Sequence, residues 1–338
     1  MDVDRPRISQ GRFLVVGFGS IGKRHLTNLL ELNVRDVAVF DVCEDRREEA
    51  HEQFGVPVFA DLELALSGDV EAALICTPTS LHLSNAMLAA RAGCHLFIEK
   101  PLSSTLHGVD ELLEEVQQRQ LVTLVGCNFR FHPGLQRVKG LLGQRVIGKV
   151  VSVRAQFGQY LPDWHPHEDY RRGYSAQSAL GGGVILDRIH EFDYLRWLFG
   201  EFREVYSMAE HLSHLEIDTE DVAEILMRFV NGAIGSVHLD YVRRTYDSSL
   251  EIIGEQGLIQ WSYPKHRVRW YAANDSTWES KEWPNYNGNE MYLAEMEHFL
   301  KALAGEEVSV QDVSSAKRVL EIALAVKRSA KQGRSIHL

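Results

Sequence analysis

The feature that most constrains the fold of this chain is a glycine-rich turn close to its N-terminus. The apolar run Phe13–Val16 leads directly into Gly17-x-Gly19-x-x-Gly22. Three leucines follow at helical spacing, namely Leu26, Leu29 and Leu30. In a strand-turn-helix of this kind the first glycine permits the tight turn, the second lets the backbone approach a pyrophosphate, and the third lets the helix pack on the sheet. The sequence therefore predicts a dinucleotide-binding unit.

The residues after the turn bear on the choice of cofactor. A second apolar run, Val37–Phe40, ends in Asp41, about twenty residues beyond the turn. An acidic side chain there can accept a hydrogen bond from a ribose 2'-hydroxyl, which favours NAD. Arg46 and Arg47 follow closely and could instead face a 2'-phosphate, so NADP is the alternative. The turn residues expected to contact the cofactor are Gly17, Phe18, Gly19, Ser20, Ile21 and Gly22.

Length and charge limit the partners of the chain. Its 338 residues suggest two domains, and its formal net charge of -11, without a long basic run, argues against nucleic acid or an anionic membrane. The polar start and the lack of a long apolar run predict no signal peptide and no membrane span, hence a cytoplasmic protein. The widely spaced Cys43, Cys76, Cys94 and Cys127 are interpreted as buried thiols in a reducing compartment. A small molecule is the expected partner.

Two patterns divide the chain. Up to about Asn128, six apolar runs alternate with helical segments, which predicts a parallel sheet with ligand bound beyond the carboxyl ends of its strands. Beyond it, alternating runs such as Lys149–Phe157, and an Asn231-Gly232 hairpin signal, predict a large, mainly antiparallel open sheet. We therefore expect an α/β fold, with a doubly wound Rossmann domain at residues 1–128 and an α+β domain at 129–338. The cleft between them is the expected active site, and a last helix at about 313–331 could pack on either domain.

Three residues are the candidates for catalysis. Lys100 follows the fifth apolar run, where its ammonium could stabilise the alkoxide that forms as hydride leaves. Asp187 and His190 lie in the predicted helix Leu186–Phe199, so that a carboxylate could orient a histidine base. Three glycines before that helix, at 181–183, would allow close approach of a ligand. The alternatives are a solvated lysine, a helix-start aspartate and an interface histidine.

The loop 160–174 is the candidate substrate loop because it is rich in aromatic rings, histidines and arginines. Its rings could cover a sugar face, and its arginines could meet a carboxylate or phosphate, which suggests an acidic or phosphorylated sugar. The candidates are Tyr160, Trp164, Arg171, Arg172 and Tyr174. A lid or interface loop is the alternative. We expect no metal site, although His165, His167 and Glu168 could be read as ligands, since the loop offers no fixed geometry.

The motifs together resemble the glucose-fructose oxidoreductase and inositol dehydrogenase family, written Gfo/Idh/MocA, over nearly the whole chain. The resemblance rests on the glycine turn, Thr77-Pro78-Thr79 with His82, Glu99-Lys100-Pro101 and the triple glycine followed by Asp187 and His190. It implies oxidation or reduction of sugars, cyclitols or their derivatives, and a C-terminal sheet that forms homodimers or homotetramers. The residues implied to line the cofactor site are Thr77, Pro78, Thr79 and Glu99, and His82 and Lys100 of the same motifs are expected there too. Asn128 and Arg130 follow the sixth apolar run, where they could reach the nicotinamide or the substrate, or else lie at the domain junction.

The chain departs from the family pattern in one place, because His190 follows Asp187 by three residues where the family commonly has four. The expected reaction is hydride transfer between nicotinamide and a secondary alcohol, with Lys100 and His190 in contact with substrate. Two alternatives stay open. One is a regulator that binds NAD and a sugar without catalysis, and the other is an enzyme with tightly held NAD that performs redox-neutral chemistry.

Overall fold

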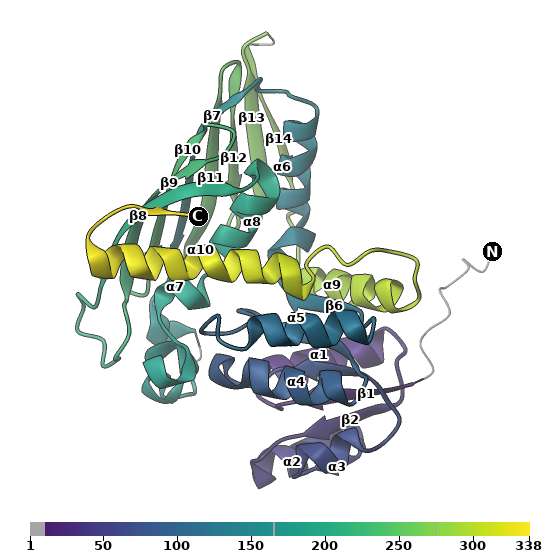
Figure 1. Cartoon of the computed structure of the whole chain (residues 1–338). Coiled ribbons are helices and arrows are strands. Elements are labelled where there is room, and N and C mark those ends of the chain that lie inside the picture. The colour runs from purple at the N-terminus through teal and green to yellow at the C-terminus, as the bar shows by residue number, and fades with distance from the viewer. Residues whose placement is uncertain (1–10, 165, 275) are drawn as a thin grey trace, which may run out of the picture. The chain divides into compact units, whose positions relative to one another are not determined.

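A computed structural model of the chain describes residues 11–164, 166–274 and 276–338. Within it the chain forms two compact units (Figure 1). The first unit combines the residues up to Asn128 with Asn289–Lys317, and the second combines Phe129–Gly288 with Arg318–Leu338. The division therefore differs from the expected one for Asn289–Lys317, a segment that we had assigned to the second domain.

The first unit is built on a six-stranded parallel sheet in the order β3-β2-β1-β4-β5-β6. Its strands are β1 (Arg12–Val16), β2 (Val37–Phe40), β3 (Val58–Phe59), β4 (Val70–Ile75), β5 (His95–Glu99) and β6 (Thr123–Gly126). Its helices are α1 (Ser20–Glu31), α2 (Glu44–Phe54), α3 (Leu62–Leu66), α4 (His82–Arg91), α5 (Val109–Gln118) and α9 (Asn289–Leu303). The predicted parallel arrangement is confirmed.

Apolar side chains on both faces of this sheet explain why its strands read as continuous apolar runs. On one face Phe13, Val15 and Leu74 pack with Leu26 and Leu29 of α1. The same cluster takes in Met296 and Phe299 of α9, whose Phe299 ring lies 5.6 Å from that of Phe97. Helix α4 contacts β4, β5 and α5. Helix α9, although late in the sequence, is thus part of the first unit's core.

The second unit contains a nine-stranded sheet in the order β14-β13-β12-β11-β7-β10-β9-β8-β15. Its strands are β7 (Val150–Gly158), β8 (Phe202–Glu210), β9 (Val222–Phe229), β10 (Ile234–Asp240), β11 (Asp247–Gly254), β12 (Gly257–Ser262), β13 (Arg267–Ala272), β14 (Thr277–Glu282) and β15 (Ile336–His337). Neighbouring strands run antiparallel except β7 and β10, which are parallel. The expected mainly antiparallel sheet is confirmed.

The two faces of this sheet differ because side chains alternate along each strand. Val153, Ala155 and Phe157 of β7 are buried, whereas Arg154 between them is exposed. On the buried side, α6 (Pro133–Gly143) contacts β12, β13 and α8 (His190–Phe199) (Figure 1). The C-terminal part of α10 (Val313–Gln332) bonds to β8 through Ser329 and Ser207.

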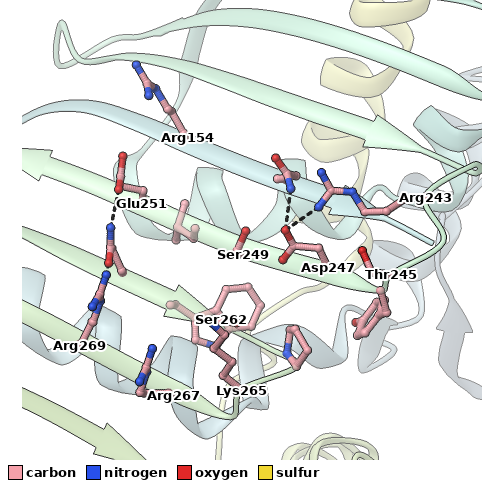
Figure 2. A pocket seen from close by; sticks show the side chains of 16 residues that line it. Arg154, Arg243, Thr245, Asp247, Ser249, Glu251, Ser262, Lys265, Arg267 and Arg269 are labelled. Atoms are coloured by element: carbon pink, nitrogen blue, oxygen red, sulfur yellow. Dashed lines mark hydrogen bonds and ion pairs between the residues drawn. The ribbon is translucent and has the colours of Figure 1, made fainter.

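The opposite face of the sheet is polar and hollowed. A pocket of about 500 Å³ lies on it. Figure 2 shows side chains of β7, β11, β12 and β13 that line this pocket, some of them joined by hydrogen bonds and ion pairs. Asp247 accepts from Gln156 at 2.6 Å and from Arg243 at 2.8 Å. Five lysine and arginine side chains line it against two carboxylates: Arg154, Arg243, Lys265, Arg267 and Arg269 against Asp247 and Glu251.

Two expectations about local structure are wrong, and three strands were not expected. The helix expected at Leu186–Phe199 is two helices, α7 (Val184–Asp187) and α8, because the backbone leaves helical geometry at Arg188, with φ -97° and ψ 36°. Cys43 is exposed rather than buried, since it lies at the start of α2 beyond the strand; the other cysteines are buried. The second sheet also contains β8, β14 and β15, which we did not predict.

In the described part of the chain, no helix is long and apolar enough to cross a membrane.

Candidate functional site

The glycine turn between β1 and α1 has the geometry that its sequence predicts. Gly17 has φ +98°, a conformation that favours glycine, and a Cβ on Gly22 would lie 2.0 Å from the carbonyl oxygen of Gly17. A Cβ on Gly19 would meet no atom within 4 Å, and no side chain caps the start of α1. Ser20 is exposed and Ile21 half-buried. The turn thus presents uncapped N–H groups at an open surface, which suits a pyrophosphate.

Asp41, directly after β2, is held in place by one backbone donor of this turn and one of the segment that follows β2. Its carboxylate accepts from the N–H of Phe18 at 2.7 Å and from the N–H of Cys43 at 2.8 Å. The residue is 3% exposed, and Arg46 approaches it at 3.5 Å. Arg47 donates to the carbonyl oxygen of Asp41 instead. The acidic group is therefore fixed next to the turn, where a ribose hydroxyl would meet it.

His82 links the segments that follow β4 and β5. Its Nδ1 lies 2.8 Å from the carbonyl oxygen of Pro101, and its Nε2 lies 2.8 Å from that of Thr77. Burial lowers the pKa of His82, while the two carbonyl groups and Glu99 oppose this shift. Thr79 is buried and Pro78 is exposed. Because both ring nitrogens of His82 face backbone carbonyls, the side chain supports these two segments from within.

Glu99 lies beside Lys100 at the end of β5. Its Oε1 lies 2.6 Å from Nε2 of His25, a buried residue of α1, and its Oε2 accepts from the backbone N–H of Lys100 at 3.2 Å. Burial raises the pKa of Glu99, but the hydrogen bond and charge of His25 outweigh it and hold the pKa below its usual value. Glu99 is thus an anion that fixes the backbone from which the Lys100 side chain extends.

Asn128 and Arg130 follow β6 and have different surroundings. Asn128 is 2% exposed, and within the described residues its Oδ1 has no hydrogen-bond partner, so a donor such as a carboxamide could bind it. Arg130 is a residue of the second unit. It forms a bidentate pair with Asp193, through Nε at 2.9 Å and Nη2 at 2.8 Å. Of the two, only Asn128 keeps a place among the cofactor candidates.

Asp187, at the end of α7, collects three hydroxyl groups. Tyr174 donates to its Oδ1, while Ser175 and Tyr241 donate to its Oδ2 at 2.8 Å and 2.9 Å. The aspartate is 1% exposed. Burial and the charge of Asp187 raise the pKa of Tyr241, so this phenol stays protonated. No local pattern in the sequence indicates that Ser175 meets Asp187, and its position after the second sheet's hairpin made Tyr241 only a weak candidate for substrate contact.

The triple glycine at 181–183 lets another segment of the same chain, Tyr174–Ser175, pack closely against it. This corrects the expectation that it allows a ligand to approach. A Cβ on Gly182 would lie 2.2 Å from the carbonyl oxygen of Tyr174 and 2.7 Å from that of Ser175. The N–H of Gly183 donates to the carbonyl oxygen of Ser175 at 3.1 Å. Glycine at 182 therefore lets the Tyr174–Ser175 segment lie close enough for both hydroxyls to reach Asp187.

His190 begins α8 after the break at Arg188. Its ring is 5% exposed and lies 4.9 Å from that of Phe129. Arg188 stacks on the Phe157 ring at 3.5 Å and pairs with Glu191 at 3.1 Å. Asp187 and His190 thus belong to different helices, and the shortened interval between them is accommodated by the non-helical turn at Arg188 rather than by one continuous helical face.

The other loop candidates are placed differently from one another. Arg244 stacks on the Tyr160 ring at 3.5 Å, and the Trp164 ring lies 5.4 Å from that of Tyr241. Arg171 is exposed and pairs with Asp169 and Glu216, both at 2.8 Å. Arg172 is exposed. Because Arg171 already has two carboxylate partners, it gives little support to an acidic substrate.

The metal alternative concerned His165, His167 and Glu168. His165 lies outside the described residues, and His167 and Glu168 are exposed. Among the described residues, no group of three or more histidine, cysteine, aspartate or glutamate side chains is arranged to hold a metal ion.

The strand order of the first unit, with a glycine turn after β1 and an acid after β2, is that of a Rossmann dinucleotide-binding domain. Comparison with known families agrees. Residues 11–127 match the oxidoreductase family with an NAD-binding Rossmann fold, and residues 135–260 match the GFO/IDH/MocA C-terminal domain. The chain belongs to the Gfo/Idh/MocA family of oxidoreductases, as the sequence motifs predicted.

Individual relatives support this assignment. The chain is 31% identical to myo-inositol 2-dehydrogenase of Thermotoga maritima over 97% of its own length and 98% of the relative's. It is 25% identical to the NAD-dependent scyllo-inositol 2-dehydrogenase of Bacillus subtilis, over 97% and 96%. A solved levoglucosan dehydrogenase, in complex with NADH and levoglucosan, superimposes with a TM-score of 0.88 at 23% identity, covering 97% and 98% of the two chains. That likeness shows the fold.

Proposed function

We propose that this protein is an NAD-dependent dehydrogenase that acts on a secondary alcohol of a sugar or cyclitol. The observation that carries the proposal is the pairing of a family Rossmann domain with a buried Asp187 that accepts hydrogen bonds from three hydroxyl groups, three residues before His190 in the sequence. Full-length relatives named as inositol dehydrogenases supply the substrate class. The second unit, which contains these residues, is accordingly proposed as the substrate-binding part.

The first unit has the features that NAD needs. Gly19 leaves open space above the start of α1, Asp41 is fixed beside the turn, and Asn128 offers a buried acceptor. A carboxylate beside the turn favours the free ribose hydroxyls of NAD over the 2'-phosphate of NADP. Bound NAD would supply the hydride acceptor.

The chain's own residues would handle the proton and the charge. We assign Lys100 to the substrate oxygen, whose developing negative charge its ammonium would stabilise. We assign His190 as the group that takes the hydroxyl proton. Glu99, His25 and His82 hold the segments around Lys100, and Asp187 orients the hydroxyl groups of Tyr174, Ser175 and Tyr241.

The test is absorbance at 340 nm with purified protein, NAD or NADP, and a panel of substrates. The panel contains myo-inositol, scyllo-inositol, levoglucosan, aldoses, uronic acids and nucleotide sugars. We expect NADH to form with a neutral polyol and NAD to be preferred over NADP. Binding of NAD in calorimetry without turnover of any compound would contradict the proposal and favour a regulator. NAD that survives purification would favour a redox-neutral enzyme.

We also propose that the polar face of the nine-stranded sheet joins copies of the chain. Five large apolar residues are exposed on it: Met208, Leu226, Ile234, Ile253 and Trp278. Apolar groups on an open sheet face favour association. Sedimentation equilibrium is expected to give a dimer or tetramer, and Leu226→Lys to shift it toward monomer. A wild-type protein that stays monomeric at concentrations well above that of the assay would refute this, because mass action favours association as the concentration rises.

A further inference from the structure

The hydrogen bonds around Asp187 determine what kind of group Tyr174 can recognise. An ionised carboxylate only accepts hydrogen bonds, so each hydroxyl that contacts it must direct its proton toward it. Three such donors also stabilise the ionised form of a buried acid. Asp187 is therefore a fixed acceptor, and the hydroxyl protons of Tyr174, Ser175 and Tyr241 are committed to it.

The three hydroxyls are not equally accessible. Tyr241 and Ser175 are buried, whereas Tyr174 is partly exposed. The backbone next to Tyr174 is fixed, because the carbonyl oxygen of Ser175 accepts from the N–H of Gly183 and from Thr219 Oγ1, both at 3.1 Å. Tyr174 is thus the member of this cluster that a ligand can reach, and its ring is oriented before the ligand arrives.

We propose that Tyr174 is a specificity-determining residue that accepts a hydrogen bond from a substrate hydroxyl, and that Asp187 is the positioning residue that makes it an acceptor. A phenol has one proton, and here it points to Asp187. Any further partner of the phenol oxygen must therefore be a donor. A C–OH group qualifies, whereas an ether oxygen, a carbonyl, a carboxylate or a phosphate does not.

This inference rests on the proposed function and narrows its substrate class. At the position that meets Tyr174, the substrate carries a hydrogen-bond donor, which in a sugar or cyclitol is a free hydroxyl, and carries no anionic group. The carboxylate of Asp187 also makes the phenol oxygen of Tyr174 a stronger acceptor, because a hydroxyl that donates to an anion gains electron density on its oxygen. Ser175 and Tyr241 contribute by holding the second oxygen of Asp187 in place.

The first test needs no substrate. Neutron diffraction from deuterium-exchanged crystals of the protein with NAD is expected to show a deuteron on Tyr174 Oη directed to Asp187 Oδ1, and none on the carboxylate. A deuteron on Asp187, or a Tyr174 deuteron directed elsewhere, would overturn the inference. This outcome is independent of turnover, so it separates failure of the inference from failure of the proposed function.

The second test uses myo-inositol, or whichever panel compound is oxidised, together with its monofluorinated analogues, since carbon-bound fluorine cannot donate. We expect one analogue to lose about 10-fold in kcat/KM with the wild type, the loss of about one hydrogen bond. Tyr174→Phe should lower kcat/KM for the parent compound by a similar factor, mainly through a higher KM. For that analogue, Tyr174→Phe should cause no further loss of kcat/KM relative to the wild type. Fluorine's electronic effect is the same in both enzymes and cancels in the comparison.

Two further variants separate recognition from structure. Asp187→Asn, like Tyr174→Phe, is expected to lose the discrimination between the parent compound and that analogue, because an amide no longer fixes the phenol proton. Tyr241→Phe leaves the Tyr174 hydrogen bond intact and should keep most of the discrimination. If Tyr174→Phe lowers kcat/KM for the parent and for every analogue by the same factor, Tyr174 has a structural role only and the proposal is wrong.

Discussion

Replacing Lys100 with methionine is expected to lower kcat by about 100- to 1,000-fold, the cost of removing one preorganised donor from a developing oxyanion. Methionine keeps an unbranched side chain that is shorter by one atom, and it removes the charge and the hydrogen-bond donors. The residues that build the dinucleotide turn, from Gly17 to Gly22 and Asp41, are untouched. The dissociation constant for NAD, measured by calorimetry, should therefore change by less than about two-fold. That factor corresponds to about 0.4 kcal/mol of binding free energy.

The matched control for this variant is Lys331→Met, which makes the same chemical change at an exposed position near the end of α10. It should leave both kcat and NAD binding unchanged. Near-wild-type turnover of Lys100→Met with the identified substrate would remove Lys100 from the mechanism. A large loss of NAD affinity would instead place its ammonium among the cofactor contacts.

The first unit could be predicted from sequence because its signals are local. Its signals lie within thirty residues, roughly one βαβ unit: the glycine spacing, a continuous apolar strand and a following acid. Each of them has a single physical explanation. The structure agrees with these signals, because Gly22 has no room for a Cβ and the carboxylate of Asp41 accepts a hydrogen bond from the backbone of the turn. Helix α9 shows the limit of such patterns. Its apolar face predicts burial, but nothing in it indicates which sheet Met296 and Phe299 will cover.

The candidate site could be predicted only in part because its contacts are distant in sequence. Lys100, Asp187 and His190 were recognisable from motifs, but the donors to Asp187 come from Tyr174, Ser175 and Tyr241. The break between α7 and α8 contains no glycine or proline, so no local signal predicts it. Strand β14 was missed for a related reason, since all of its residues are exposed and it lacks an apolar alternation.

Asp193→Asn is expected to destabilise the second unit by about 3–5 kcal/mol, because it leaves the Arg130 guanidinium buried without a compensating charge. The side chains of Arg130 and Asp193 are 6% and 1% exposed. All six tryptophans of the chain lie between Trp164 and Trp283, within the second unit. Urea unfolding followed by tryptophan fluorescence therefore reports this unit alone, while NAD binding reports the first.

Two control variants show whether the buried ion pair is responsible. Glu204→Gln breaks a partly exposed pair with Arg228 at 2.9 Å and should cost no more than about 1 kcal/mol. The double variant Arg130→Met/Asp193→Leu removes both charges, so it should be less destabilised than Asp193→Asn alone, since no charge is then left buried and unpaired. Equal, small losses for Asp193→Asn and Glu204→Gln would mean that water reaches Arg130 in solution. The arginine would then regain its place among the residues that could contact substrate or cofactor.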